Sequence, residues 1–353
     1  MSIREMKTDK KFIRALPKVE LHIHLDCSVS YEVVKKLWPS VSEEEYRKRF
    51  IGPDNCTNLR DFLKCVSNGI DLMQTETEIR EVVNGLFHQL QQDNVIYAEI
   101  RFAPLLHLNN KLLPEEVVEI AVDAVRVCSH STGIKAGIIL CTLRHFSEEQ
   151  NLQTIKLVEQ FINTNVVAFD IAGDEAGYPV DAHKKAFEYA IKKNIPVTAH
   201  AGEAKGADSV WETLKYFNPQ RIGHGVRSTE DARLIEYVIK NNIHLEVCPT
   251  SNILTGIYRN YSEHPVNHLF NAGVSIGINT DGRSLINVSL TDEYIKLAEA
   301  FNWQGKHFYA CNINALNHTF LPGKEKEEFK KVLDGEYLEI INNYKDDKNE
   351  AVV

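Results

Sequence analysis

The chain has 353 residues, of which 43% are hydrophobic and 25% charged, and its formal net charge is -9. Length and composition fit a globular protein with a large core, built as two small domains or as one α/β barrel. A negative surface disfavours polyanions, so we expect neither nucleic acid nor an anionic membrane as a partner. No pattern in the sequence indicates the oligomeric state.

Cysteine usage points to a reducing compartment. The number of cysteines is odd, they are scattered, and no C-x-x-C pair occurs, so we expect reduced thiols and no disulfide framework. The first ten residues lack the apolar stretch of a secretion signal, and no apolar run is long enough to cross a bilayer. We therefore expect a cytoplasmic protein. The seven cysteines are Cys27, Cys56, Cys65, Cys128, Cys141, Cys248 and Cys311.

Eight short segments rich in β-branched or apolar residues are predicted to be strands, because each ends in small or polar residues. Between most of them apolar residues recur at i, i+3 and i+4, which predicts helices, most clearly over Pro114–Ser129, Glu148–Thr164, Ala182–Lys193 and Ser228–Asn241. The predicted strands are Val19–Asp26, Val95–Pro104, Lys135–Leu143, Asn165–Gly173, Pro196–Glu203, Arg221–Val226, His244–Pro249 and Val274–Asp281.

The alternation of eight strands with helices predicts a parallel sheet that closes into a (β/α)8 TIM barrel. An open doubly wound sheet is the main alternative, and it requires a glycine-rich phosphate turn after the first strand. The segment in that position, Asp26–Ser30, contains no G-x-G-x-x-G motif. The pattern therefore favours the barrel.

A long segment between the first two strands falls outside this repeat. Residues 27–94 are far more than one helix needs, and they contain predicted helices at Glu43–Phe50 and Leu59–Met73. We interpret the segment as a helical lid insertion over the barrel mouth. Leu59, Phe62 and Leu63 have the spacing of an apolar face that could cover a pocket.

Three further helices are predicted after the last strand, at Asp292–Phe301, Lys306–Phe320 and Lys324–Tyr344, with Thr291 as N-cap of the first. They extend the barrel without forming a second domain, so residues 1–344 are expected to be one catalytic domain. The charged, uncapped residues 345–353 are expected to be a frayed tail.

Metal-ligand residues stand at or near the ends of three predicted strands. His22 and His24 share one face of the first strand, His200 lies near the end of the fifth, and Asp281 ends the eighth. Catalytic groups of a TIM barrel come from the carboxyl ends of its strands, so these side chains should converge. Three histidines and a carboxylate suit Zn²⁺ better than Mg²⁺ or Ca²⁺. No lysine ends the fourth strand to bridge two metals, so we expect one Zn²⁺ per chain.

Four more polar residues lie at strand ends of the same barrel. Glu203 is either an acid that faces the metal or a solvated residue before a helix, and His224 is either catalytic or structural. Their positions favour catalysis for both. Asp170 and Asp174, at the end of the fourth strand, fit two interpretations equally well: partners that orient histidines, or N-caps of the next helix.

This set of groups suits hydrolysis at a carbon that bears nitrogen. Zinc with an open coordination position makes hydroxide available near neutral pH, a histidine orients the water or takes its proton, and a carboxylic acid protonates the group under attack. Deamination of an aromatic amine and hydrolysis of an amide both fit. The motifs G-x-S-x-G, H-E-x-x-H and H-x-E with P-C-x-x-C are absent.

Six motifs in chain order together resemble the adenosine deaminase family. They are Pro17–Asp26 (PKVELHIHLD), Asp170–Glu175 (DIAGDE), His200–Glu203 (HAGE), Gly223–Gly225 (GHG), Cys248–Ser251 (CPTS) and Asn279–Asp281 (NTD). The resemblance implies a (β/α)8 barrel that deaminates adenosine, and 2′-deoxyadenosine as well, to inosine and ammonia in purine salvage. It also implies one zinc ion held by His22, His24, His200 and Asp281.

The resemblance further implies the roles of the remaining site residues. Glu203 would protonate purine N1. His224 would orient and deprotonate the water that attacks C6, and Asp281 would accept from that water. For substrate binding it implies that the Gly173 backbone contacts N3 and that Asp26 contacts the ribose 5′-hydroxyl. His24 would face the substrate, and Leu59, Phe62 and Leu63 would cover it.

Two positions depart from the family pattern. Cys27 stands where the family usually has glycine, and Gly282 stands where many members have an aspartate that holds purine N7. A water molecule or Arg283 could replace that contact. We expect weaker or broader substrate recognition and an intact reaction, because one lost hydrogen bond typically costs about 0.5–1.5 kcal/mol.

Three alternatives remain open at the level of sequence. The first is the same chemistry on another 6-aminopurine, such as adenine or a 5′-modified nucleoside. The second is a two-metal phosphoester or lactone hydrolase on the same barrel. The third is a non-enzymatic protein with a structural zinc, although such a site needs neither Glu203 nor His224.

Overall fold

The structure is a computed structural model that describes residues 10–53 and 66–350, of which 341–350 are described by their backbone alone. Its eight strands agree with the eight predicted segments, each within a few residues. They are β1 Lys18–His24, β2 Val95–Phe102, β3 Lys135–Leu143, β4 Val166–Ala172, β5 Thr198–Ala201, β6 Arg221–His224, β7 His244–Val247 and β8 Ile276–Ile278.

The strands form two parallel four-stranded sheets, β1-β2-β3-β4 and β5-β6-β7-β8, and parallel bridges join them at both seams. At one seam His24 N donates to Asp281 O at 2.7 Å and Asp281 N donates to His22 O at 3.0 Å. At the other, Phe169 N donates to Pro196 O at 3.0 Å. The first seam brings the first and last strands side by side and the second joins β4 to the start of β5, so the fold is the predicted (β/α)8 barrel.

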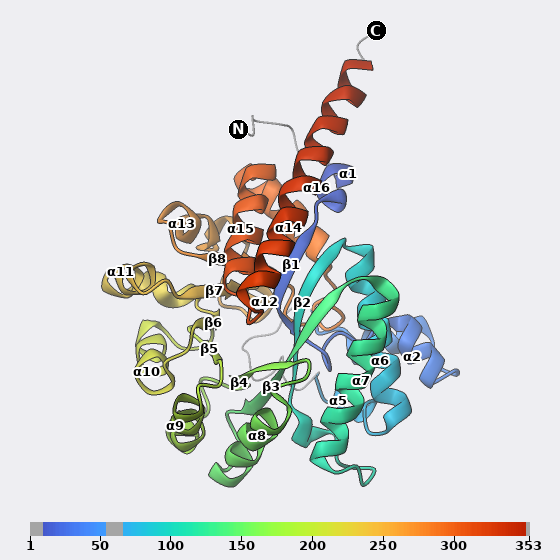
Figure 1. The fold of residues 1–353 in the computed structure, drawn as a ribbon, viewed down its shortest axis with the longest axis vertical. Coiled ribbons are helices and arrows are strands. Elements are labelled where there is room, and N and C mark those ends of the chain that lie inside the picture. The colour runs from blue at the N-terminus through green and yellow to red at the C-terminus, as the bar shows by residue number, and fades with distance from the viewer. Residues whose placement is uncertain (1–9, 54–65, 351–353) are drawn as a thin grey trace.

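Helices form an outer ring around the strands (Figure 1). An amphipathic helix or a pair of short helices follows each of the strands β2 to β7, because the apolar residues of each repeat face the sheet. The elements are η2 Pro104–Leu106, α7 Pro114–Thr132, α8 Glu148–Phe161, η3 Asp181–His183, α9 Lys184–Lys193, α10 Ala207–Phe217, η4 Val226–Glu230, α11 Ala232–Lys240, α12 Pro249–Leu254, η5 Tyr261–Glu263 and α13 Val266–Asn271.

The segment between β1 and β2 is helical, as predicted. Its described elements are α2 Tyr31–Leu37, α3 Glu43–Phe50, α5 Ser67–Asp71 and α6 Glu76–Gln92. The helix predicted at Leu59–Met73 is confirmed only as α5, which ends two residues before Met73. Leu59, Phe62 and Leu63 lie outside the described residues, so their role as a lid stays a prediction.

Short helix α1 (Lys10–Ala15) precedes the barrel, and α14 Leu290–Phe301, α15 Gly305–Asn317 and α16 Gly323–Glu350 follow it. The N-cap predicted at Thr291 is wrong. Ser289 caps α14, since its hydroxyl accepts from Asp292 N at 3.1 Å while the Asp292 carboxylate accepts from Ser289 N at 3.1 Å. Helix α16 extends to Glu350, beyond the end predicted at Tyr344, and it projects away from the barrel (Figure 1). None of the helices within the described residues is both long and apolar enough for a membrane span.

Candidate active site

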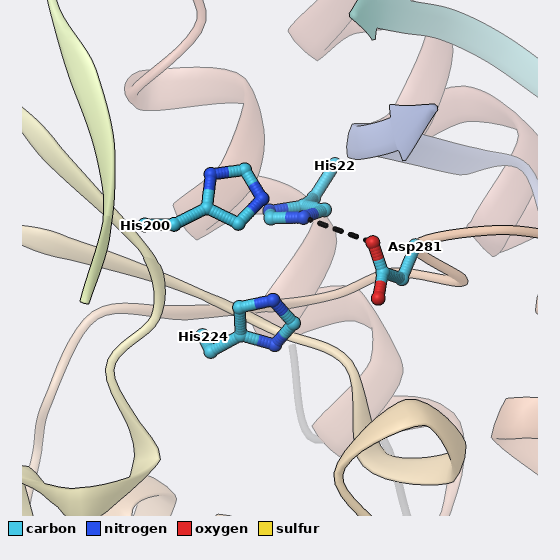
Figure 2. Close-up of side chains that lie close together, drawn as sticks. All are labelled: His22, His200, His224 and Asp281. Atoms are coloured by element: carbon cyan, nitrogen blue, oxygen red, sulfur yellow. Dashed lines mark ion pairs between the residues drawn. The ribbon is translucent and has the colours of Figure 1, made fainter. Parts of the chain in front are cut away.

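Four of the polar side chains at the strand ends converge on one point. The possible ligand atoms of His22, His200, His224 and Asp281 all lie within 4.8 Å of one another (Figure 2). They come from β1, β5, the end of β6 and the loop after β8, so barrel closure is what brings them together. His24 also belongs here: its Nε2 lies 3.2 Å from His200 Nε2 and 3.4 Å from Asp281 Oδ1. The structure thus places all four predicted ligands side by side.

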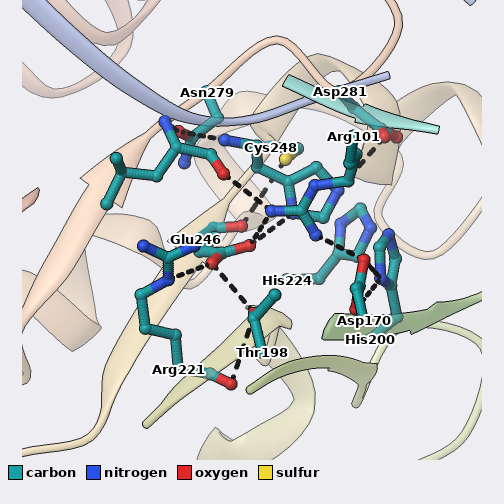
Figure 3. A network of polar contacts seen from close by, with 12 residues as sticks. Arg101, Asp170, Thr198, His200, Arg221, His224, Glu246, Cys248, Asn279 and Asp281 are labelled. Carbon is teal, nitrogen blue, oxygen red and sulfur yellow. Dashed lines mark hydrogen bonds and ion pairs between the residues drawn. The ribbon is translucent and has the colours of Figure 1, made fainter. Parts of the chain in front are cut away.

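Two buried carboxylates hold the rings of His22 and His200. His22 Nδ1 donates to Glu246 Oε2 at 2.8 Å, and His200 Nδ1 donates to Asp170 Oδ1 at 3.2 Å. Arg101 joins the two carboxylates, with Nη2 2.6 Å from Glu246 Oε2 and Nη1 2.8 Å from Asp170 Oδ2 (Figure 3). Because both Nδ1 atoms carry the proton, both Nε2 atoms keep a free lone pair.

That arrangement fits a divalent cation. His22 Nε2 is buried and has no hydrogen-bond partner, which is costly unless the lone pair meets a positive charge. Burial alone would raise the pKa of Asp281, but the surrounding histidines, with His22 Nε2 at 3.3 Å, hold it well below its usual range. A carboxylate beside histidines with free lone pairs is a donor set typical of zinc.

The interpretation of Asp170 as a residue that orients a histidine matches its contacts, whereas Asp174 instead accepts from Gly177 N at 2.9 Å within a turn. Sequence reasoning missed Arg101 and Glu246. The available signal was that each is a charged residue inside a buried strand, where a side chain facing the barrel axis needs a partner.

Glu203 is buried beside the cluster and is suited to act as an acid. Its Oε1 has no hydrogen-bond partner, and its Oε2 lies 3.6 Å from His224 Nε2. Burial, together with the charges of Asp281 and Glu175, raises the pKa of Glu203 well above its usual value, which favours the protonated acid. Glu175 fixes the loop, because its carboxylate accepts from Gly202 N at 2.8 Å and Glu203 N at 3.1 Å.

His224 and Asp281 both adopt left-handed backbone conformations, with φ of 61° and 65°. This conformation is uncommon in residues other than glycine, although asparagine, aspartate and histidine adopt it more often than the rest, and it clusters at functional sites. The glycine before His224 is needed for packing, since a Cβ on Gly223 would lie 2.9 Å from Cε1 of His22. Helix α12 supports both strained residues: Ser251 Oγ donates to Asp281 Oδ2 at 2.7 Å, and Asn252 Nδ2 lies 3.1 Å from His224 Nδ1.

His24, His200, His224 and Asp281 line a cavity of about 390 Å³. Apolar side chains and the Gly173 backbone form much of its walls, and Asp26, Asp174, Glu203 and His145 add polar groups to those of the cluster that face it. Burial raises the pKa of Asp26 to about 6. Among the described residues that line the cavity there is no lysine or arginine; the lining includes Val66, Ile70, Leu106, Leu143, Ala172, Tyr178 and Leu285.

The two unusual positions, Cys27 and Gly282, both line this cavity. The suggestion that Arg283 replaces a missing contact there is wrong. Its guanidinium is buried elsewhere, with Nη2 2.5 Å from Glu20 Oε2 and Nη1 2.5 Å from Asp93 Oδ2. These two ion pairs hold the Arg283 side chain away from the substrate cavity, which Arg283 does not line.

Comparisons with known proteins identify the family of the chain. The adenosine deaminase family model matches residues 17–335. An adenosine deaminase from Clostridium acetobutylicum is 35% identical, covering 92% of this chain and 99% of its own. A zinc-bound amidohydrolase structure from B. ambifaria has a TM-score of 0.87 at 19% identity, covering 97% and 96% of the two chains. An adenine deaminase from Arthrobacter aurescens has a TM-score of 0.84 at 22% identity, covering 93% and 99%.

The two structural neighbours are too distant in sequence to show more than the shared barrel. The family model and the bacterial relative span nearly the whole chain, including all the strand ends at which the cluster forms. Fold, site and sequence therefore lead to one conclusion: this chain is a hydrolytic deaminase that belongs to the adenosine deaminase family.

Proposed function

We propose that the protein converts adenosine, and 2′-deoxyadenosine, to inosine and ammonia with one zinc ion per chain, held by His22, His24, His200 and Asp281. One observation carries the proposal. A cavity large enough for a nucleoside holds a convergent histidine–aspartate cluster and, beside it, a buried carboxylic acid. A bound zinc ion would supply hydroxide near neutral pH.

The chain's own residues account for the remaining chemistry. Glu203, kept protonated by burial, is placed to protonate purine N1, which makes C6 more electrophilic. His224 lies at the cluster, with its Nε2 3.6 Å from Glu203 Oε2, and we assign it to the attacking water. Apolar walls exclude bulk water, so each of these interactions is stronger than at an exposed site.

Substrate contacts follow from the lining of the cavity. Gly173 has a φ of 98°, and its backbone borders the cavity, where it is free to contact purine N3. Asp26 is the acceptor we assign to the ribose 5′-hydroxyl. His24 lines the cavity, and we assign it to both the metal and the substrate. The described lining residues include acidic groups but no lysine or arginine. A 5′-phosphate would be repelled by the acidic groups and would find no basic side chain among them, so it is disfavoured.

We also assign the protein to the cytoplasm and to purine salvage. All five cysteines within the described ranges are free thiols, four of them buried, which is typical of a reducing compartment. The alternative substrates are adenine and 5′-modified nucleosides. They would use the same metal and acid but would leave Asp26 without a ribose partner.

A steady-state absorbance assay tests the proposal with adenosine, 2′-deoxyadenosine, adenine and AMP as parallel substrates. Adenosine and 2′-deoxyadenosine should be converted fastest, and AMP slowest. Activity should be lost after chelation, return with one equivalent of Zn²⁺, and fall in Glu203→Gln. Preferential conversion of adenine or AMP would overturn the substrate assignment. Two bound metals per chain would instead favour the two-metal hydrolase.

A further inference from the structure

The histidines of the cluster differ in what their Nδ1 atoms face. The Nδ1 atoms of His22 and His200 face carboxylates, which can only accept, so those nitrogens carry the proton. His224 Nδ1 instead lies 3.1 Å from the side-chain amide of Asn252. An amide can present either its oxygen or its NH2 group, so the orientation of Asn252 decides where His224 carries its proton.

The orientation of Asn252 is fixed by His264. The backbone N–H of Val266 donates to His264 Nδ1 at 3.1 Å, and a backbone N–H can act only as a donor. His264 is buried, and burial lowers its pKa to about 3, so the ring is neutral and its single proton is on Nε2. That proton is donated to Asn252 Oδ1 at 3.2 Å. The NH2 group of Asn252 must then face His224.

We propose that Asn252 and His264 are positioning residues that hold His224 with its proton on Nε2. In this tautomer His224 Nδ1 accepts from Asn252, and Nε2–H points toward Glu203 and the cluster. The nitrogen that faces the site then has no lone pair and cannot bind a metal. The direction of these hydrogen bonds therefore distinguishes His224 from the proposed metal ligands His22 and His200. Distance alone does not distinguish them, because all three rings belong to the same cluster.

The consequence for catalysis rests on the proposed function. A histidine held as the Nε2–H tautomer donates a hydrogen bond to the attacking oxygen and cannot take a proton from it at Nε2. His224 would therefore orient the water and stabilise the charge that develops on its oxygen. This assignment replaces the role of general base that the family resemblance implied for His224.

The tautomer itself can be measured without substrate. In protein labelled with ¹⁵N-histidine, ¹⁵N shifts and long-range proton couplings distinguish a protonated from an unprotonated imidazole nitrogen. The signals of His224 are assigned by their loss in His224→Gln, and spectra are recorded with and without Zn²⁺. We expect a protonated Nε2 and an unprotonated Nδ1 in both states. A proton on Nδ1 in the wild type would overturn the proposal.

Asn252→Asp provides the decisive variant, because a carboxylate can only accept. His224 should then carry a proton on Nδ1, and kcat should fall about tenfold to a hundredfold with little change in KM. The same substitution at exposed Asn241 is the matched control and should change neither the spectrum nor kcat. An unchanged His224 spectrum in Asn252→Asp would contradict the proposal.

Two variants of His264 test the far end of the network. His264→Gln keeps an N–H donor toward Asn252 and should retain the tautomer, whereas His264→Phe removes the donor and should give mixed tautomers. A melting curve for each variant separates this effect from misfolding. If the expected tautomer is found but adenosine is not converted, the proposed function fails and the inference about His224 stands.

Discussion

The side chain of Cys27 occupies the space that a side chain at position 282 would need. A Cβ added to Gly282 would lie 2.6 Å from the Cβ of Cys27, closer than two such atoms can approach. The two departures from the family pattern are therefore one structural change: the side chain at position 27 leaves room only for glycine at 282.

Gly282→Ala should destabilise the protein by about 1–3 kcal/mol because it overpacks this contact. Cys27→Gly in the same chain should restore most of the loss, since it removes the opposing Cβ. Urea denaturation of both single variants and the double variant gives the coupling energy. Gly335→Ala is the control, because nothing lies near that exposed glycine. Additive effects of the two substitutions would disprove the pairing.

Wild-type enzyme should discriminate weakly between adenosine and 7-deazaadenosine. Gly282 has no side chain, and Arg283 is held by Glu20 and Asp93, so neither supplies a hydrogen bond to purine N7. Adding a carboxylic acid that donates to N7, through Cys27→Gly with Gly282→Asp, should increase discrimination by about tenfold, the effect of one hydrogen bond. The ratio of kcat/KM values measures this. Strong discrimination in the wild type would contradict the prediction.

Glu246→Gln should weaken metal binding about tenfold to a hundredfold, because the charged partner of His22 Nδ1 is lost. Removal of the metal from wild type should also lower the melting temperature, since a ligand at 100 times its Kd contributes about 2.7 kcal/mol. Competition with a chromophoric chelator measures the affinity. Glu236→Gln on the surface of α11 is the control, and equal affinities in both variants would exclude this role for Glu246.

Glu203→Gln should lower kcat by about a hundredfold or more, because glutamine cannot donate the proton needed at N1. In wild type, kcat should decline as the pH rises through the raised pKa of Glu203, since only the protonated form is active. The alkaline limb of the pH profile should be absent from the residual activity of the variant. If the alkaline decline of kcat persists in Glu203→Gln, a group other than Glu203 is responsible for it.

Buried Glu293 should make stability fall between pH 4.5 and about 7. Burial raises its pKa from 4.5 to about 7, so in this window the unfolded chain releases a proton that the folded chain retains. Stability is full below pH 4.5, decreases by on the order of 3 kcal/mol up to pH 7, and is then flat. Glu293→Gln should lack this part of the dependence. If the free energy of unfolding has the same pH dependence in wild type and in Glu293→Gln, the assignment to Glu293 is refuted.

The sequence was sufficient for the barrel and for the residues at its strand ends. His22, His24, His200 and Asp281 could be predicted to converge because strand ends in a closed barrel share one rim. Arg101, Glu246 and the pair Asn252–His264 could not, since their contacts cross the barrel or join separate loops. Whether two such side chains meet depends on the register of distant strands and on how each side chain is oriented. The sequence around either residue does not determine these features.

Local signals also failed where two residues competed for one role. Thr291 and Ser289 both suit an N-cap, and only the reciprocal bond with Asp292 decides for Ser289. Arg283 stood in the right place to face the substrate, but two buried carboxylates on other elements bind it more strongly. Ion pairing across the core therefore overrode sequence position.

The left-handed backbone at His224 and Asp281 sets a limit on engineering. Most other non-glycine residues with positive φ in the described ranges are asparagines, which tolerate that conformation. Glycine at 224 or 281 would relax the chain by about 1 kcal/mol while deleting a reactive group. A library ranked only by heat resistance would therefore enrich inactive clones at these two codons, so both must be held constant in any thermostabilisation campaign.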